Sequence, residues 1–208
     1  MLQKSITGKL KKNSLELLSF ANSQGLESDA VLIGFGISGQ ADVLAGQGAS
    51  TVYLGEDASL EIYNTEQYTA LVSDALEKSG ATQVWLSSSE LGRDLAPRVA
   101  ARHGVGALSD VTQLEVNVDE IVAYRPCMAT KVIQKCKFSK DGLRVISIRS
   151  GFFAADETSP AKANIVSLLI PEGHPQLKVI DVQVEVSDEV ELNEANIVVS
   201  VGRGVGGT

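Results

Sequence analysis

The chain has 208 residues, of which 18 are Lys or Arg and 26 are Asp or Glu, so its net charge is −8. Such an acidic chain lacks the cationic field that phosphate backbones attract, which argues against nucleic acid or an anionic membrane surface as partner. A hydrophobic fraction of 44% is too high for a disordered chain. No apolar run approaches the roughly 20 residues that cross a bilayer. We therefore expect a globular cytoplasmic protein without membrane insertion.

The first hundred residues alternate helix-like and strand-like segments. Asn13 followed by Glu16 resembles a capping box and predicts a helix from Ser14 to about Ser23. Strands that alternate with helices predict a parallel sheet with right-handed crossovers. The later segments, in chain order, are a strand at 30–34, a short helix at 40–47, a strand at 51–54, a helix at 64–78, a strand at 82–87 and a helix at 91–102.

After about Gly104 the pattern changes to strands joined by short polar turns. Strands are predicted at 111–118, 120–125, 131–138 and 143–149, and Asp141-Gly142 is a typical hairpin turn between the last two. A long polar loop is predicted at 151–173, and clean alternation at 179–186 predicts a half-exposed strand. The predicted fold class is α/β: a doubly wound, mainly parallel, Rossmann-like sheet with a short antiparallel extension from about 112 to 150.

The last 22 residues differ in character from the rest. Residues 187–194 form an acidic stretch typical of a linker. Residues 195–201 are typical of a buried strand, and a glycine-rich turn follows them. A strand without its following helix cannot bury both faces. We therefore expect residues 1–186 to form one domain, and residues 187–208 to be a linker and the first strand of a second domain.

Two turns are alternative candidates for a ligand site, one rich in glycine and one rich in serine. Gly34, Gly36 and Gly39 follow a strand, and Glu56 or Asp57 ends the next one, as in a dinucleotide fingerprint. A nicotinamide-dependent oxidoreductase is therefore one alternative. The glycines equally suit a strand-to-helix turn that needs them for its own backbone, and the helix after them is short.

The second turn contains Ser87, Ser88 and Ser89, at the end of a strand and the start of a helix. Such serines can bind an anion, and together with Gly34 they allow an adenine-nucleotide-binding regulatory module. They serve equally well as helix caps. The two histidines, His103 and His174, have no nucleophile in a suggestive context, so no catalytic residue is predicted. Cys127 and Cys136 lack zinc spacing, so we expect free thiols, a reducing compartment and no metal site.

Longer segments resemble the alpha subunit of the electron transfer flavoproteins. The segments that carry this resemblance run through the chain in the family's order. They are GKLKKNSLELL at 8–18, LGRDLAPRVAARHGVGALSDVT at 91–112, VISIRSGFF at 145–153 and ANIVVSVGRG at 195–204. The resemblance implies an electron carrier rather than an enzyme, formed from alpha and beta subunits. It implies FAD bound mainly by a C-terminal domain of the alpha subunit, with this chain as the N-terminal scaffold domain.

The resemblance also implies partners and one group of cofactor-binding residues. Acyl-CoA or other dehydrogenases would donate electrons, and a quinone reductase or another acceptor would receive them. Gly202, Arg203 and Gly204 match the family's turn beside the flavin, where the arginine raises the reduction potential. Val201 departs from the glycine usual there. The family does not use a Gly34–Gly39 fingerprint, and its opening strand corresponds here to a short edge strand at 1–6. The present chain alone is expected to bind FAD poorly.

Overall fold

The computed structural model describes residues 10–117, 120–138, 142–153, 159–171, 176–183 and 197–206. The chain divides into two units, Met1–Lys178 and Val179–Thr208. The helices of the first unit are α1 (Lys12–Ser23), α2 (Ala41–Gly46), α3 (Thr65–Ser79) and α4 (Glu90–Arg102). Its strands are β1 (Ser28–Gly34), β2 (Ala49–Glu56), β3 (Gln83–Ser87), β4 (Ala107–Val111), β5 (Gln113–Val116), β6 (Ile121–Cys127), β7 (Val132–Lys137), β8 (Arg144–Ile148) and β9 (Ile165–Ser167).

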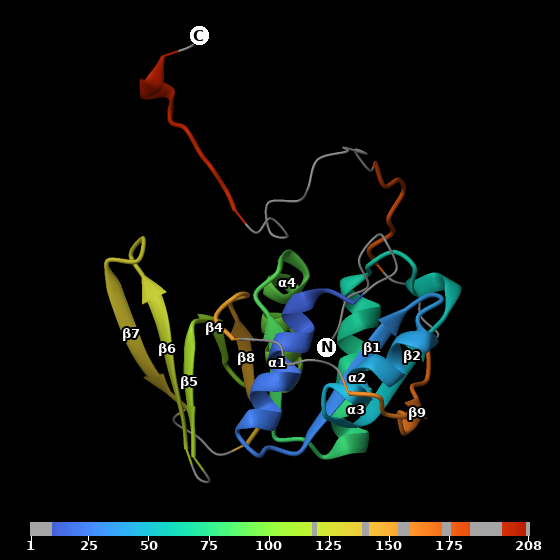
Figure 1. Ribbon diagram of the computed structural model, residues 1–208. Helices are drawn as coiled ribbons and strands as arrows, with labels where there is room; N and C mark the ends of the chain where they lie inside the picture. Colours follow the sequence, from blue (N-terminus) through green and yellow to red (C-terminus); the bar gives the residue numbers. More distant parts are fainter. Residues whose placement is uncertain are drawn as a thin grey trace. The chain divides into compact units, whose positions relative to one another are not determined.

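These strands form three three-stranded sheets (Figure 1). The orders β1-β2-β9 and β3-β8-β4 are parallel throughout, whereas β5-β6-β7 is antiparallel. The antiparallel sheet stands beside β4 and β8 at one end of the unit (Figure 1). This arrangement confirms the predicted α/β class, with a mainly parallel sheet and a short antiparallel extension.

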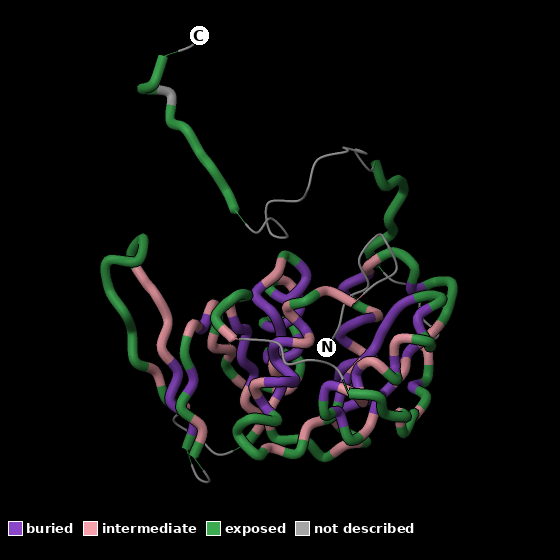
Figure 2. Tube along the Cα trace, in the orientation of Figure 1, coloured by how far each residue is buried: buried purple, intermediate pink, exposed green. Residues whose placement is uncertain are grey.

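Helices cover both faces of the parallel strands, which makes the fold doubly wound. Ala30 and Leu32 of β1 pack with α1 and α2, whereas Ile33 of the same strand packs with α3. In β8, Val145 lies in the α3–α4 core, and Ile146 packs toward α1 and the antiparallel sheet. Successive residues of one strand therefore enter different cores, as the alternation of a pleated strand requires. Figure 2 shows the buried residues concentrated in these layers.

Helix α3 shows why the local predictions in the first half succeed. The Asn64 side chain accepts hydrogen bonds from the backbone N–H groups of Glu66 and Gln67 at 3.0 and 3.3 Å, which caps the helix. Gly80 ends it in the left-handed conformation, with φ at 65°. One face buries Tyr68, Leu71, Val72 and Ala75. Each of these signals is local, and the predicted range of 64–78 is confirmed within one residue.

The capping box predicted for α1 is wrong. The N-cap residue is Lys11, and it makes no side-chain capping bond. The Asn13 amide instead donates to the Ser87 hydroxyl at 3.3 Å, and the buried Glu16 carboxylate accepts from the backbone N–H of Gly151 at 3.0 Å. Both side chains tie α1 to strand ends distant in sequence, which no local pattern reveals.

The predicted hairpin between the last two strands of the second half is also wrong. Strand β8 pairs with β3 and β4 in parallel, and β7 pairs with β6. Four successive residues of β8, 145–148, are buried, so this strand belongs in a covered sheet interior. The predicted strand at 111–118 is divided: β4 joins the parallel sheet and β5 the antiparallel one, on either side of Thr112.

Two further differences concern residues after 150. The predicted loop at 151–173 contains the three-residue strand β9, which pairs with β2 in parallel. Residues 179–183 form no strand and are exposed, so that part of the predicted strand at 179–186 is wrong, and 184–186 lie outside the described residues. Within the described ranges, no helix has both the length and the apolar character of a membrane span.

Candidate functional site

The glycine-rich turn after β1 binds a carboxylate of the protein itself. The Glu56 side chain accepts hydrogen bonds from the backbone N–H groups of Ile37 and Ser38, at 2.8 and 3.4 Å. Gly36 supplies the positive φ of 63° that the turn needs. A ligand phosphate would have to displace this carboxylate, because it needs the same N–H groups. The geometry therefore favours a structural turn over a dinucleotide site.

The acidic residue next to Glu56 is also engaged. Asp57 caps the short 3₁₀ helix η2 (Ala58–Leu60) by accepting from the backbone N–H of Ser59 at 2.8 Å. This backbone hydrogen bond lowers the pKa of Asp57 below its ordinary value. After the turn come the 3₁₀ helix η1 (Ser38–Gln40) and then α2, which has six residues. So short a helix has little macrodipole to hold a pyrophosphate.

The three serines at the end of β3 have hydrogen-bond partners elsewhere in the chain. The Ser87 hydroxyl lies 3.3 Å from that of Ser150, and the Ser88 hydroxyl lies 2.9 Å from that of Ser147. The Ser89 hydroxyl caps α4. These contacts fasten the carboxyl ends of β3 and β8 together. The structure therefore gives all three predicted anion-binding serines a structural role.

An ion pair that sequence reasoning missed lies at the same edge of the sheet. Arg149, directly after β8, donates from Nε to Asp110 Oδ1 at 2.9 Å and from Nη2 to the other carboxylate oxygen. Asp110 itself has φ at 62°, and its backbone N–H donates to Ser147 Oγ. The hydrogen bonds from Arg149 lower the pKa of Asp110, while its partial burial opposes them. The left-handed backbone conformation of Asp110 directs its carboxylate toward Arg149. No sequence pattern predicts that conformation or this ion pair.

We expect Asp110→Asn to lower the free energy of unfolding by about 1 kcal/mol at pH 7, because the pair is partly exposed. Asparagine is isosteric and tolerates positive φ, so the substitution removes the charge alone. Because the folded-state pKa of Asp110 is depressed, its contribution is present above the unfolded pKa of about 4 and is lost as pH falls through the folded value. Urea denaturation should therefore show a smaller stability difference from the unsubstituted chain at about pH 3 than at pH 7. An equal difference at both pH values would contradict this.

The predicted cofactor-binding turn lies in the second unit. Arg203 begins the 3₁₀ turn η3 (Arg203–Val205), in which the backbone N–H of Val205 donates to the carbonyl of Gly202 at 3.2 Å. Gly202 and Gly204 are exposed, with open space where a side chain would begin. The Arg203 side chain lies outside the description. The described turn thus provides an exposed backbone edge and no enclosed cavity.

The remaining candidates have ordinary surroundings. His103 ends α4, and its Nε2 lies 3.1 Å from Ser73 Oγ; His174 lies outside the described residues. Cys127 and Cys136 are free thiols, as predicted. In the described ranges, no three His, Cys, Asp or Glu side chains are grouped to hold a metal.

Comparison with known proteins decides the family. The family model described as the electron transfer flavoprotein domain matches residues 1–171. The chain belongs to the electron transfer flavoprotein domain family. This membership confirms the resemblance identified in the sequence. It also agrees with the doubly wound sheet described above.

Several curated members of this family are similar along nearly the whole chain. Protein FixB of Clostridium saccharobutylicum is 30% identical over 96% of the chain and 62% of that protein. Electron transfer flavoprotein subunit alpha of Thermoanaerobacterium thermosaccharolyticum is 29% identical, with 96% and 63% covered. Acryloyl-CoA reductase electron transfer subunit beta of Anaerotignum propionicum is 25% identical, with 95% and 63% covered. The chain thus spans less than two thirds of the length of these relatives.

Proposed function

We propose that this chain is the scaffold and partner-binding domain of an electron transfer flavoprotein alpha subunit. The observation that carries the proposal is the family match over residues 1–171, together with the relatives named as such subunits. In the intact protein, FAD would supply the electron-accepting and electron-donating chemistry. The protein would bind the flavin, orient it and control contact with partners. It would act as an electron carrier and not as an enzyme with a substrate of its own.

The proposed partners follow from the family. A beta subunit would pair with this chain. Acyl-CoA or other dehydrogenases would donate electrons, and a quinone reductase or another acceptor would take them, in the cytoplasm. Exposed apolar side chains at the outer hairpin support a docking role: Met128, in the turn between β6 and β7, is 78% exposed, and Val132 and Ile133 of β7 are exposed as well. Exposed apolar side chains that lie close together are typical of surfaces that other proteins cover.

In the proposed domain assignment, residues 1–186 form the scaffold domain. Residues 187–208 form a linker and the first strand of the flavin domain. Ile197 is 83% exposed, and Val198, Val199 and Val201 are exposed with it. Such a run of β-branched residues is typical of a strand covered on both faces. Its exposure supports the view that its covering elements belong to a further domain. Gly202, Arg203 and Gly204 would then form one edge of the flavin site.

Ligand titration separates this proposal from its two rivals. A ligand that only the native state binds raises the melting temperature. Because we expect the 208-residue chain to bind none of the three ligands tightly, its melting temperature should stay unchanged with 1 mM FAD, NADH or AMP. A rise with NADH that Gly36→Ala abolishes would favour the nicotinamide-dependent oxidoreductase. A rise with AMP alone would favour the nucleotide-binding regulatory module. Purification of the chain as a yellow, stoichiometric FAD complex would contradict the domain assignment.

A further inference from the structure

The chain that follows β9 is attached to helix α3 at two places. The first is near the carboxyl end of the helix, where Lys78 Nζ donates to the carbonyl of Ser167 at 3.4 Å. The backbone N–H of Leu169 donates to Asp74 Oδ2, also at 3.4 Å. Between these two residues, Leu168 is buried in the core under α3 and α4. We call this attachment the core fastening.

The second attachment is at the first turn of α3. The backbone N–H of Gln176 donates to Glu66 Oε2 at 2.8 Å, and Asn64 Nδ2 donates to the carbonyl of Leu177 at 2.9 Å. Lys178, the next residue, is the last of the first unit. We call Asn64, Glu66 and the backbone of residues 176–177 the exit clasp, because the chain leaves the first unit there.

Asn64 has two tasks in the exit clasp. Its Oδ1 caps α3, as described above, and its Nδ2 holds Leu177. The side chain is nearly buried, with 6% of the residue exposed. A buried amide donor that loses its acceptor carries a desolvation penalty, so Asn64 favours the closed clasp. Glu66 adds a charge-assisted hydrogen bond, which is stronger than one between neutral groups.

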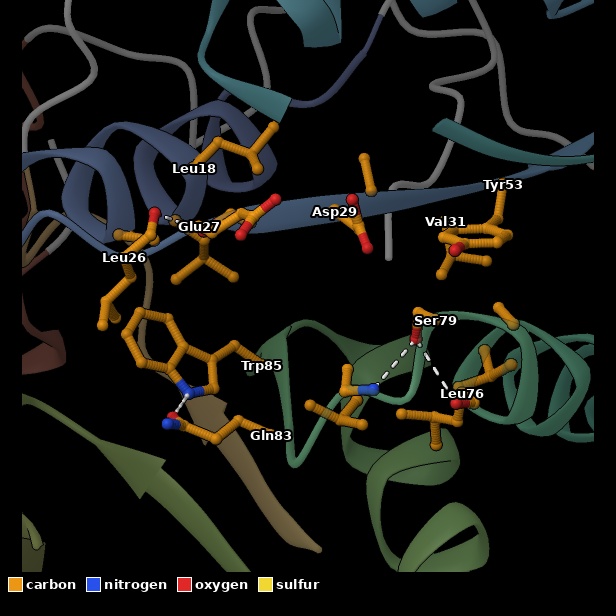
Figure 3. Close-up of a pocket in the computed structure, with 18 of the residues that line it drawn as sticks. Leu18, Leu26, Glu27, Asp29, Val31, Tyr53, Leu76, Ser79, Gln83 and Trp85 are labelled. Carbon is orange, nitrogen blue, oxygen red and sulfur yellow. Dashed lines mark hydrogen bonds between the residues drawn. The ribbon is translucent and has the colours of Figure 1, made fainter. Parts of the chain in front are cut away.

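The helix that carries the exit clasp is held at both ends. Beside the clasp, the Tyr63 hydroxyl donates to Asp94 Oδ2 of α4 at 2.6 Å. At the far end, Ser79 Oγ donates to the carbonyl of Leu76 at 3.3 Å and accepts from the backbone N–H of Ala81 at 3.2 Å (Figure 3). The clasp therefore fixes residues 176–177 to a rigid part of the first unit.

The exit clasp is the weaker of the two attachments. Gln176 and Leu177 are both exposed, and Leu177 has 49% of its surface in contact with solvent. The core fastening, in contrast, includes the buried Leu168, which follows directly on β9. Local opening begins where few apolar contacts are buried. The clasp can therefore open while the core fastening stays closed.

We propose that the exit clasp sets where the connector to the second unit begins, with Asn64 and Glu66 as its positioning residues. When the clasp is closed, the connector begins at Lys178, beside the first turn of α3. When it opens, residues 171–177 join the connector and add up to about 23 Å of extended chain, at roughly 3.3 Å per residue. A longer tether lowers the effective concentration of the second unit near the first. The consequence for a flavin domain rests on the proposed function, whereas the clasp itself does not.

Trypsin can report the state of the clasp in the 208-residue chain. Between residues 150 and 202, the only lysines are Lys162 and Lys178, and there is no arginine. A protease needs several extended residues on both sides of the bond that it cuts. Cleavage after Lys178 therefore requires the clasp to open, and its rate follows the population of the open form.

Two variants open the clasp in different ways. Glu66→Ala removes the acceptor for the N–H of Gln176. Asn64→Asp removes the donor to Leu177, while aspartate still caps the helix. We expect each variant to speed cleavage after Lys178 about fivefold, as the loss of one hydrogen bond implies. Hydrogen exchange at the amide of Gln176 should accelerate in Glu66→Ala as well.

Glu77→Ala is the matched control, because Glu77 is an exposed glutamate of the same helix outside both attachments. It should leave cleavage after Lys178 unchanged. Cleavage after Lys162 is the internal reference and should be the same in all variants. Equal rates after Lys178 in Glu66→Ala and Glu77→Ala would overturn the proposal. So would an equal acceleration after Lys162 and Lys178, since the substitutions would then lower the stability of the whole unit.

Discussion

Replacing Gly92 by alanine is expected to lower the free energy of unfolding by more than about 3 kcal/mol. A Cβ atom built at Gly92 would lie 1.8 Å from the backbone oxygen of Ser87. That oxygen belongs to the last residue of β3, and Gly92 lies in the first turn of α4, which is capped by Ser89. Neither backbone can move alone, because β3 is paired with β8 and α4 is packed in the core.

Gly39 provides the matched control for this substitution. Nothing lies within 4 Å of the position where its Cβ would begin, and its φ is ordinary. We expect Gly39→Ala to change the free energy of unfolding by less than about 1 kcal/mol. Urea denaturation of both variants, with the slope of the transition compared as well as its midpoint, measures the difference. Similar midpoints for the two variants would show that α4 can move away from β3, contrary to this packing.

The helices and strands described in the first half of the fold were predicted because most of their signals are local, although the cap of α1 was not. Helix α3 has a capping asparagine, an apolar face and a terminal glycine within 17 residues. The second half was harder because pairing there is not local. β8 follows β7 in sequence, yet it inserts between β3 and β4. The apolar residues 145–148, buried in succession, were the available sign that this strand belongs inside a parallel sheet.

The candidate sites were also hard to predict, because their side chains bind partners that are distant in sequence. The glycine spacing at 34–39 matches a dinucleotide fingerprint, but the pattern does not reveal that Glu56 occupies the N–H groups of the turn. The ion pair between Arg149 and Asp110 depends on the left-handed backbone conformation of Asp110, which no sequence pattern predicts. The edge strand predicted at 1–6 lies outside the described residues and stays a prediction.

The second large effect is expected at Arg203, in the proposed longer protein in which residues 202–204 border the flavin. Arg203→Gln should lower the one-electron reduction potential of the bound FAD by about 90–130 mV. The physical reason is the lost attraction between the guanidinium and the negative charge that the flavin gains on reduction. For an assumed separation of about 5–8 Å and an effective dielectric constant of about 20, Coulomb's law gives an attraction of about 2–3 kcal/mol. For one electron, that free energy corresponds to the stated potential.

A spectroelectrochemical titration of the flavin measures this shift, and a further variant separates charge from structure. Arg203→Lys should restore most of the potential, because it keeps the positive charge on a flexible side chain. If Arg203→Gln left the potential unchanged, Arg203 would not act on the flavin. In that case the glycines on either side of it would serve only to turn the backbone.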